Sequence, residues 1–376
     1  MERKNVATIR AVAEAAGVSK TTVSFVMNDT RPQVDRIPEE TRERIKACAA
    51  ALGYSSNVIA ASIRTGKRVW VGVMTEVLPS DPVLWPSSPF FHVSFLYGVQ
   101  RKLADNGYFT ILALRSLENE VQDMELLASA RIGGLILRSA DAPAVAKAEE
   151  LLAVGVPVIN VFPREKSDLF PYVVDLDNVR AGVVAAELVI KSGLRNPACV
   201  TVARSRPSLL DRQAGMVDTI RRELGIVPGI CELPISNGDD PPKVDNVRAF
   251  KVIEEFVRKN RPDALVALDG GASLVLSLAL DNIPVEIPRD VSVIGFDSFL
   301  TGTSKFRKLS SVGVSWLNAG EVAASIVVDQ VERGQTAQQL PRLLQPVFVP
   351  GDTTTPGLSH EVTIDELSSL ITYADR

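Results

Sequence analysis

Cysteine and histidine are scarce in this chain. Its 376 residues include three cysteines, Cys48, Cys199 and Cys231, and two histidines, His92 and His360. The cysteines are odd in number and widely spaced with no CxxC pair, which excludes a disulfide framework and a thiolate zinc site and is typical of a reducing cytoplasm. Because the two histidines lie far apart in the sequence, a histidine-based metal site or catalytic triad is not expected.

Long apolar runs and nucleotide-binding or nucleophile motifs are also missing. No stretch reaches the ~18 apolar residues that a membrane span needs, and residues 1–5 lead into a charged amphipathic segment rather than a signal peptide. The sequence contains no GxGxxG, GxxxxGKS/T or GxSxG pattern. We therefore expect no enzymatic activity, no cofactor, no metal and no membrane association.

The charge is divided unevenly along the chain. Residues 1–68 hold 12 lysines and arginines against 7 acidic residues, a net charge of +5, whereas the other 308 residues hold 29 against 38, a net charge of −9. A basic head on an acidic body is expected where only the head meets nucleic-acid phosphates. At 46% hydrophobic and 23% charged residues, the chain has room for two or three globular domains.

The segment 8–28, TIRAVAEAAGVSKTTVSFVMN, predicts two short helices that are separated at Gly17. The first helix has an apolar stripe at helical spacing, formed by Ile9, Val12, Ala13 and Ala16. Thr8 and Ser19 are suited to cap the first and second helices. We expect the second helix to pack through Val23, Val26 and Met27, and to expose Lys20, Thr21 and Ser24 with Phe25 beside them. Such a pair can place its second helix in the major groove of DNA; the alternative is a purely structural hairpin.

A third helix and a short helical segment follow. Pro38 begins the third helix, and Gly53 is expected to end it. We expect residues 1–54 to form one helical domain. Residues 55–68 have a helical pattern too short to be stable alone in water, so they form either a linker or a helix that folds on binding.

Taken together, these segments resemble the LacI/GalR family of bacterial transcriptional repressors. The resemblance rests on TIRAVAEAAGVSKTTVS, on EETRERI with ALGY and on residues 57–64, and it continues to about Thr355. It implies an all-α helix-turn-helix headpiece with a hinge helix, followed by a two-lobed α/β core of the type I periplasmic-binding-protein fold. In that family the hinge helix pairs with that of a dimer mate in the minor groove, where an apolar wedge kinks the DNA.

The resemblance assigns DNA contacts to the second helix and the hinge. Base-reading positions fall on Lys20, Thr21 and Phe25, where Phe25 replaces an arginine that is often found there. The positions expected to contact phosphate are Thr8, Ser19, Thr22 and Ser24. The hinge positions expected in the minor groove are Asn57, Ala60, Ile63 and Arg64, with Ile63 in place of the usual leucine wedge and Ser56 in place of a proline.

From residue 69 onward, candidate strands alternate with amphipathic helices. The strands are 69–74, 108–113, 134–137 and 156–161, then 198–202, 226–233, 264–268 and 291–295; the helices include 95–106, 180–191, 213–224 and 248–259. This alternation predicts two doubly wound lobes with parallel sheets covered on both faces. We expect lobe 1 at about 69–165 and 310–335, lobe 2 at about 166–309 and 336–356, and three crossings of the chain between them.

Ligands of such folds bind beyond the carboxyl ends of the strands, here in a cleft between the lobes. The predicted effector-binding residues are Thr75, Phe90, Phe91, Arg212, Asp269, Asp297 and Trp316. Arg212 and Asp297 match family motifs and could hold adjacent hydroxyls of a sugar. The three aromatic residues could instead belong to the core, and Asp177 with Asn178 is expected to stabilise the lobe junction.

Several departures from the family pattern leave the effector open. More polar residues of the family pattern are replaced at three places: Leu268, Phe162 with Pro163, and Ser310–Gly313. The segment that follows the first strand, 79–89, is longer than usual in the family and contains Trp85. The predicted effector is a sugar or a sugar derivative, with a non-sugar ligand or a degenerate pocket controlled by a protein partner as alternatives. A sugar-binding protein without a DNA role would not need the basic head.

The tail, residues 357–376, lies beyond the resemblance. It has a capping box at Thr363–Glu366 and an apolar face shorter than a coiled coil needs, so we expect it to dock on the body. A homodimer is expected, because paired headpieces match a pseudo-palindromic operator. The predicted protein is cytoplasmic, bacterial and nucleoid-associated; whether its effector induces or corepresses is left open.

Overall fold

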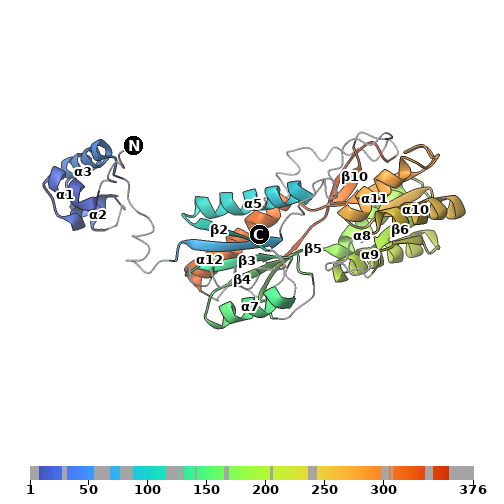
Figure 1. Ribbon diagram of the computed structural model, residues 1–376, viewed down its shortest axis with the longest axis horizontal. Coiled ribbons are helices and arrows are strands. Elements are labelled where there is room, and N and C mark those ends of the chain that lie inside the picture. The colour runs from blue at the N-terminus through green and yellow to red at the C-terminus, as the bar shows by residue number, and fades with distance from the viewer. Residues whose placement is uncertain are drawn as a thin grey trace. The chain divides into compact units, whose positions relative to one another are not determined.

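The computed structural model divides into two units, Met1–Val69 and Trp70–Arg376. The first is a small helical headpiece, drawn in blue in Figure 1. The second, the core, contains two parallel-rich sheets flanked by helices. The structure describes residues 8–27, 32–54, 68–76, 88–115, 127, 131–139, 142–164, 169–203, 206–235, 244–297, 305, 308–334 and 342–354.

The first helix of the headpiece, α1 (Ile9–Ala16), begins and ends as the sequence predicts. The Thr8 hydroxyl caps it by accepting a hydrogen bond from the Ala11 N–H at 3.3 Å. Gly17 ends it with a φ of 62°, a left-handed conformation that glycine adopts without strain. The helix is therefore fixed at both ends by local chemistry.

Helix α2 (Lys20–Met27) follows after three residues, and Ser19 caps it. The Thr22 N–H donates to Ser19 Oγ at 3.0 Å. Helix α3 (Glu39–Leu52) closes the headpiece and ends at Gly53, which has a φ of 65°. A short 3₁₀ helix, Val34–Arg36, precedes α3.

The three helices bury one small apolar core. Its fully buried members come from all three helices and from the segment before α3: Val12, Ala13, Ala16, Val23, Val26, Val34, Ile45 and Ala49. The helical stripe predicted for α1 and the inward-facing valines of α2 are confirmed by this packing.

The first sheet of the core has six parallel strands in the order β11-β5-β4-β3-β1-β2. They are β1 (Trp70–Glu76), β2 (Phe109–Arg115), β3 (Gly134–Arg138), β4 (Val158–Val161), β5 (Tyr172–Leu176) and β11 (Arg342–Leu344). One face packs on α5 (Ser88–Asp105) and α12 (Trp316–Arg333), and the other on α7 (Ala142–Ala153) (Figure 1).

The second sheet has the order β12-β10-β9-β8-β6-β7, in which β12 alone is antiparallel to its neighbour. Its strands are β6 (Pro197–Val202), β7 (Gly229–Leu233), β8 (Ala264–Ala267), β9 (Ser292–Phe296), β10 (Ser310–Gly313) and β12 (Val347–Val349). Helices α8 (Asn178–Lys191) and α9 (Pro207–Leu224) cover one face; α10 (Asn246–Asn260) and α11 (Gly270–Leu280) cover the other. Both sheets are doubly wound, as expected.

Four short strands, β5, β10, β11 and β12, are absent from the sequence-based prediction. Each has five residues or fewer, and β10 reads Ser-Ser-Val-Gly, which contains no apolar run. They also correct the lobe boundaries. The prediction put residues 166–176 and 336–344 in lobe 2 and residues 310–313 in lobe 1, whereas β5 and β11 belong to the first sheet and β10 to the second.

The chain passes between the two sheets three times, after β5, after β10 and after β11. Each strand completes its own sheet before the chain crosses, which is why the boundaries fall several residues later than predicted. The crossings lie where parallel strands end, so the residues that follow the strands of both sheets are brought together.

Residues 55–67 of the predicted hinge (55–68) and the whole predicted tail (357–376) lie outside the described residues. None of the helices in the described part of the chain is both long enough and apolar enough to span a bilayer.

Candidate DNA-binding surface and effector site

The outward side of α2 carries the predicted base-reading residues. Lys20 and Thr21 are exposed, and Phe25 is half-buried. Ser19 is exposed as well, and its Oγ lies 2.8 Å from the Thr22 hydroxyl. The first turn of α2 therefore presents polar donors and one cation on the side away from the valines of the core.

Ser24 is the exception among the predicted DNA contacts. Only 3% of its surface is exposed, so it does not lie on the outer side of α2 as predicted. Position 24 is adjacent to Val23 and one turn before Met27, and both of these pack into the headpiece core. The inner face of this short helix is wider than its apolar stripe, and the small serine fits within it.

A hollow lies beside the turn between α1 and α2. Its lining combines the end of α1 with the start of α2: Arg10, Ala13, Glu14, Gly17, Val18, Ser19 and Lys20. Arg10 and Glu14 form an exposed ion pair there, with Nε 2.8 Å from Oε1. Thr8 is exposed at the start of α1. The predicted hinge contacts Asn57, Ala60, Ile63 and Arg64 lie outside the described residues.

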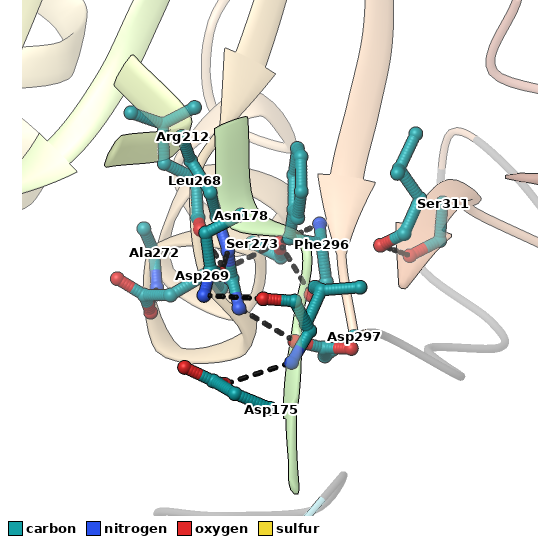
Figure 2. A network of polar contacts seen from close by, with 12 residues as sticks. Asp175, Asn178, Arg212, Leu268, Asp269, Ala272, Ser273, Phe296, Asp297 and Ser311 are labelled. Carbon is teal, nitrogen blue, oxygen red and sulfur yellow. Dashed lines mark hydrogen bonds and ion pairs between the residues drawn. The ribbon is translucent and has the colours of Figure 1, made fainter. Parts of the chain in front are cut away.

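Arg212 is the centre of a polar network at the strand ends of the second sheet (Figure 2). It lies on α9 and is 9% exposed. Its Nε donates to Asn178 Oδ1 at 2.8 Å and its Nη1 donates to the Leu268 carbonyl at 2.8 Å. Its Nη2 lies 3.5 Å from Asp297 Oδ2, and the guanidinium stacks 5.0 Å from the centre of the Phe296 ring.

Asp297 follows β9 and is held in an uncommon backbone conformation. Its φ is 45°, in the left-handed region that non-glycine residues seldom adopt. Burial raises the pKa of its carboxyl, and the nearby Arg212 cation opposes that effect. Oδ1 of Asp297 is buried and has no hydrogen-bond partner among the described residues. A buried carboxylate oxygen in that condition is suited to accept a hydrogen bond from a ligand.

Two further carboxylates lie near this pair (Figure 2). Asp269 caps α11 through a hydrogen bond from the Ala272 N–H to Oδ1 at 2.8 Å. Asp175 lies on β5, where burial raises the pKa of its carboxyl to about 6, against the lowering effects of the Leu176 N–H and the Arg212 cation. Sequence reasoning missed Asp175, since β5 itself was not predicted.

A second cluster forms at the strand ends of the first sheet. Arg138, the last residue of β3, is 6% exposed. Its Nη1 donates to Thr75 Oγ1 at 3.2 Å and lies 2.9 Å from Nδ1 of His92. Thr75, one of the predicted effector residues, therefore belongs to this cluster, whereas sequence reasoning missed Arg138 and His92. The available signal was a charged residue directly after the apolar run 134–137.

Aromatic rings enclose this cluster. Trp316, at the start of α12, lies with its ring centre 4.7 Å from that of Phe162. The Arg138 guanidinium carbon lies 5.1 Å from the Trp316 ring centre and 5.8 Å from that of Phe95. Phe90 and Phe91 lie in the first turn of α5, but their side chains are outside the described part of the structure.

The two clusters belong to one electrostatic environment. Arg138, from the first sheet, lowers the pKa of the Asp297 carboxyl in the second. Of the predicted effector residues, the structure thus places Thr75 and Trp316 in one cluster, and Arg212, Asp269 and Asp297 in the other. Among the described residues, no group of three or more histidines, cysteines and carboxylates could hold a metal ion.

A capped helix-turn-helix headpiece on a two-lobed core with polar groups at its strand ends defines a class of DNA-binding regulator with a ligand-binding core. Comparison with family models supports this class. Residues 8–57 match the model for bacterial regulatory proteins of the lacI family, and residues 186–354 match the periplasmic binding protein-like domain. The chain belongs to the LacI family of bacterial transcriptional regulators.

Similar proteins cover nearly the whole chain. The HTH-type transcriptional repressor PurR of Erwinia tasmaniensis is 27% identical over 349 residues, which are 90% of this chain and 96% of that protein. PurR of Escherichia fergusonii is 26% identical over 349 residues, which are again 90% of this chain and 96% of that protein. Both relatives are transcriptional repressors.

Two solved structures show the same fold. The lac repressor dimer bound to operator and the anti-inducer ONPF has a TM-score of 0.71 at 20% identity, over 93% of this chain and 99% of that chain. The complex of the transcriptional regulator CelR with cellobiose has a TM-score of 0.59 at 22% identity, over 92% of this chain and 99% of that chain.

Proposed function

We propose that this protein is a transcriptional repressor that binds a pseudo-palindromic operator as a homodimer and responds to a sugar-like effector bound at the two strand-end clusters. The observation that carries the effector assignment is the buried Arg212–Asp297 pair, in which Asp297 Oδ1 has no hydrogen-bond partner among the described residues. Carboxylate and guanidinium groups side by side can accept from and donate to adjacent hydroxyls.

The polar and aromatic lining together fit a sugar ring. Trp316 and Phe162 supply an apolar wall, against which the C–H face of a sugar can pack. Thr75 and Asp269 supply further polar groups from opposite sheets. Phe90 and Phe91 remain part of the proposed site through their position at the start of α5. A site of this kind has an apolar body with a few fixed polar groups, as small-molecule sites generally do.

At the DNA end, we assign base reading to Lys20, Thr21 and Phe25, all on the accessible side of α2. Thr8, Ser19 and Thr22 serve as phosphate contacts at the helix starts, where backbone N–H groups also favour anions. Asn57, Ala60, Ile63 and Arg64 are assigned to the minor groove by family resemblance. Ser24 is left out because it is buried.

Exposed apolar residues on the core support a homodimer. Val93 and Tyr97 on α5 are 63% and 58% exposed, and Phe109 and Leu112 lie on the edge strand β2 beside that helix. Exposed apolar side chains on a helix and on the edge strand beside it are typical of a subunit contact. A dimer would present two headpieces to the two halves of an operator.

The effector acts, in this proposal, by favouring one arrangement of the two lobes over another. Effector and operator affinities are then coupled reciprocally. The three chain crossings are the segments that such a change must bend. The protein would act in the bacterial cytoplasm, where operators and sugar metabolites are both present.

The test is selection of bound duplexes from a random DNA pool by the full-length protein, followed by affinity measurements with and without each sugar of a panel. We expect a two-fold symmetric site whose affinity changes with at least one sugar. A variant that lacks residues 1–68 should lose operator binding and keep sugar binding. Operator binding by that variant would contradict the headpiece assignment. Operator binding that no sugar alters would instead favour control by a protein partner.

A further inference from the structure

The pentapeptide Asp-Asn-Val-Arg-Ala occurs twice in this chain, at 177–181 and at 245–249. Both copies begin a helix in the same way. The aspartate caps the helix by accepting a hydrogen bond from the N–H three residues later, at 2.9 Å for Asp177 and at 3.1 Å for Asp245. The next residue differs, since Asn178 on α8 is 6% exposed whereas Asn246 on α10 is exposed. Because the local sequence is identical, tertiary contacts account for the burial of Asn178.

The Asn178 amide joins two neighbours that belong to different lobes. Its Nδ2 donates to the Leu176 carbonyl at 3.0 Å, and its Oδ1 accepts from Nε of Arg212 at 2.8 Å, a contact drawn in Figure 2. Leu176 ends β5 of the first sheet, whereas Arg212 lies on α9, which covers the second. The donor and the acceptor of an amide lie in one plane. A displacement of either neighbour therefore changes the geometry of both bonds.

Arg212 is also fixed to α8 by backbone packing. Gly182 lies one turn after Asn178 on α8, and a Cβ there would collide with the Arg212 carbonyl oxygen and lie 2.8 Å from the Met216 N. So close an approach leaves α8 and α9 little freedom to shift against each other. A change in the arrangement of the lobes must therefore bend the chain before α8, between Leu176 and Asn178, which is the first crossing.

The first crossing is joined to the third. The Asp177 N–H donates to the Leu344 carbonyl at 2.9 Å, at the residue where β11 ends. Two of the three segments between the lobes thus meet at the residue before Asn178. On its other side the amide holds the Arg212 guanidinium, whose Nη2 lies 3.5 Å from Asp297 Oδ2 in the proposed effector site. A ligand that moves this guanidinium displaces the amide, and with it the hydrogen bond at the crossing.

We propose that Asn178 is a positioning residue with two roles: it orients Arg212 for the effector, and it couples effector binding to the arrangement of the lobes and hence to operator affinity. This inference rests on the proposed function, in which effector and operator affinities are linked, and it assigns that coupling to one side chain. Because the amide binds Nε, it fixes the plane in which the two Nη groups of the guanidinium lie.

The experiment uses the full-length protein, its selected operator and a sugar that alters operator affinity. Fluorescence anisotropy gives operator affinity with and without saturating sugar, and the ratio of the two is the coupling factor. Calorimetry gives the sugar affinity. Asn178→Ala removes both amide bonds. We expect its sugar affinity to fall about tenfold or more, since hydrogen bonds to charged groups are the stronger ones, and its coupling factor to fall about threefold or more towards one.

Asn178→Asp separates the two roles. A carboxylate still accepts from Nε of Arg212 but has no proton to donate to the Leu176 carbonyl. Sugar affinity should therefore fall less than in Asn178→Ala, whereas the coupling factor should fall to the same extent. Asn246→Ala is the matched control, because it changes the same residue of the same pentapeptide at the same helix position, where the asparagine is exposed. It should leave both quantities unchanged.

Two results would overturn this inference and leave the sugar response intact. One is a coupling factor in both Asn178 variants equal to that of the parent, and the other is a sugar affinity in Asn178→Ala no lower than in Asn246→Ala. Thermal midpoints of all variants ensure that titrations are made on folded protein, so a merely structural role would leave the coupling factor unchanged. If no sugar of the panel altered operator affinity of the parent, the proposed sugar response would fail, and this inference with it.

Discussion

Gly313 leaves the space that the Asp297 carboxylate occupies. A Cβ at Gly313 would lie 2.7 Å from Asp297 Oδ1 and 3.3 Å from its backbone N. Asp297 is already held at a φ of 45°, a conformation that costs a non-glycine residue free energy. The absence of a side chain at Gly313 on β10 therefore makes room for the carboxylate of Asp297, which directly follows β9.

We predict that Gly313→Ala weakens effector binding without unfolding the core. The added methyl group must displace Oδ1, and its hydrogen bond to a ligand hydroxyl would be lost, at about 1–3 kcal/mol or roughly tenfold or more in affinity. Titration with whichever sugar alters operator affinity gives the measurement, and the thermal midpoint monitors the fold. Asp297→Asn is the comparison variant. Unchanged affinity in both would remove Asp297 from the site.

Asp175 gives a pH-dependent prediction for stability. Its carboxyl has a pKa of about 6 in the folded protein, against an ordinary value of 3.8. A raised acid pKa means that the folded state binds the proton more tightly than the unfolded state. The ionised carboxylate therefore lowers stability progressively between pH 3.8 and about pH 6, and the full cost of about 3 kcal/mol remains above that range.

Asp175→Asn removes that ionisation, so we expect the variant to be more stable than the parent at pH 7.5 and close to it at pH 4. Urea unfolding at several pH values measures the difference, which should grow as the pH rises through the interval. Asp177→Asn, at the cap of α8, is a nearby acidic control. A difference between Asp175→Asn and the parent that does not vary with pH would contradict the assignment.

The elements that the sequence revealed are those whose signals are local. Gly17 and Gly53 adopt the left-handed φ that ends a helix, and Thr8 and Ser19 cap the helices that follow them. Strands such as β3 and β9 were found because burial on both faces makes them continuous, mostly apolar runs. These features depend on a few neighbouring residues.

Strands that depend on partners from elsewhere could not be found in this way. The segment β10 becomes a strand because β9 and β12 lie on either side of it. The buried ring of contacts around Arg138 is likewise formed by β1, β3, α5 and α12, which are distant in sequence. Family motifs identified Arg212 and Asp297, but no motif covered Arg138. The prediction for Ser24 was wrong for a related reason. Helical periodicity alone placed its side chain on the outer side of α2, whereas tertiary packing buries it.

Ser19 and Ser24 should respond differently to truncation. Ser19→Ala removes the cap of α2 and should cost about 1 kcal/mol of headpiece stability. It should also weaken binding to operator and random duplexes alike, because a phosphate contact carries no sequence information. Ser24→Ala should leave affinity per folded molecule unchanged. Fluorescence anisotropy at a temperature where both variants are folded tests this, and an equal loss for Ser24→Ala would place that hydroxyl at the DNA.

Phe25 should determine which base is preferred at one operator position. Half-buried on the accessible side of α2, its ring can contact a thymine methyl group but cannot donate a hydrogen bond. Phe25→Arg should shift that position towards guanine by about 1–3 kcal/mol, since arginine can bind guanine O6 and N7 together. Position-by-position preferences from selected duplexes measure the shift. Ala47→Arg, on the exposed side of α3, adds the same charge and should change overall affinity alone. If both variants altered affinity equally and neither changed base preference, Phe25 would contact the DNA backbone instead.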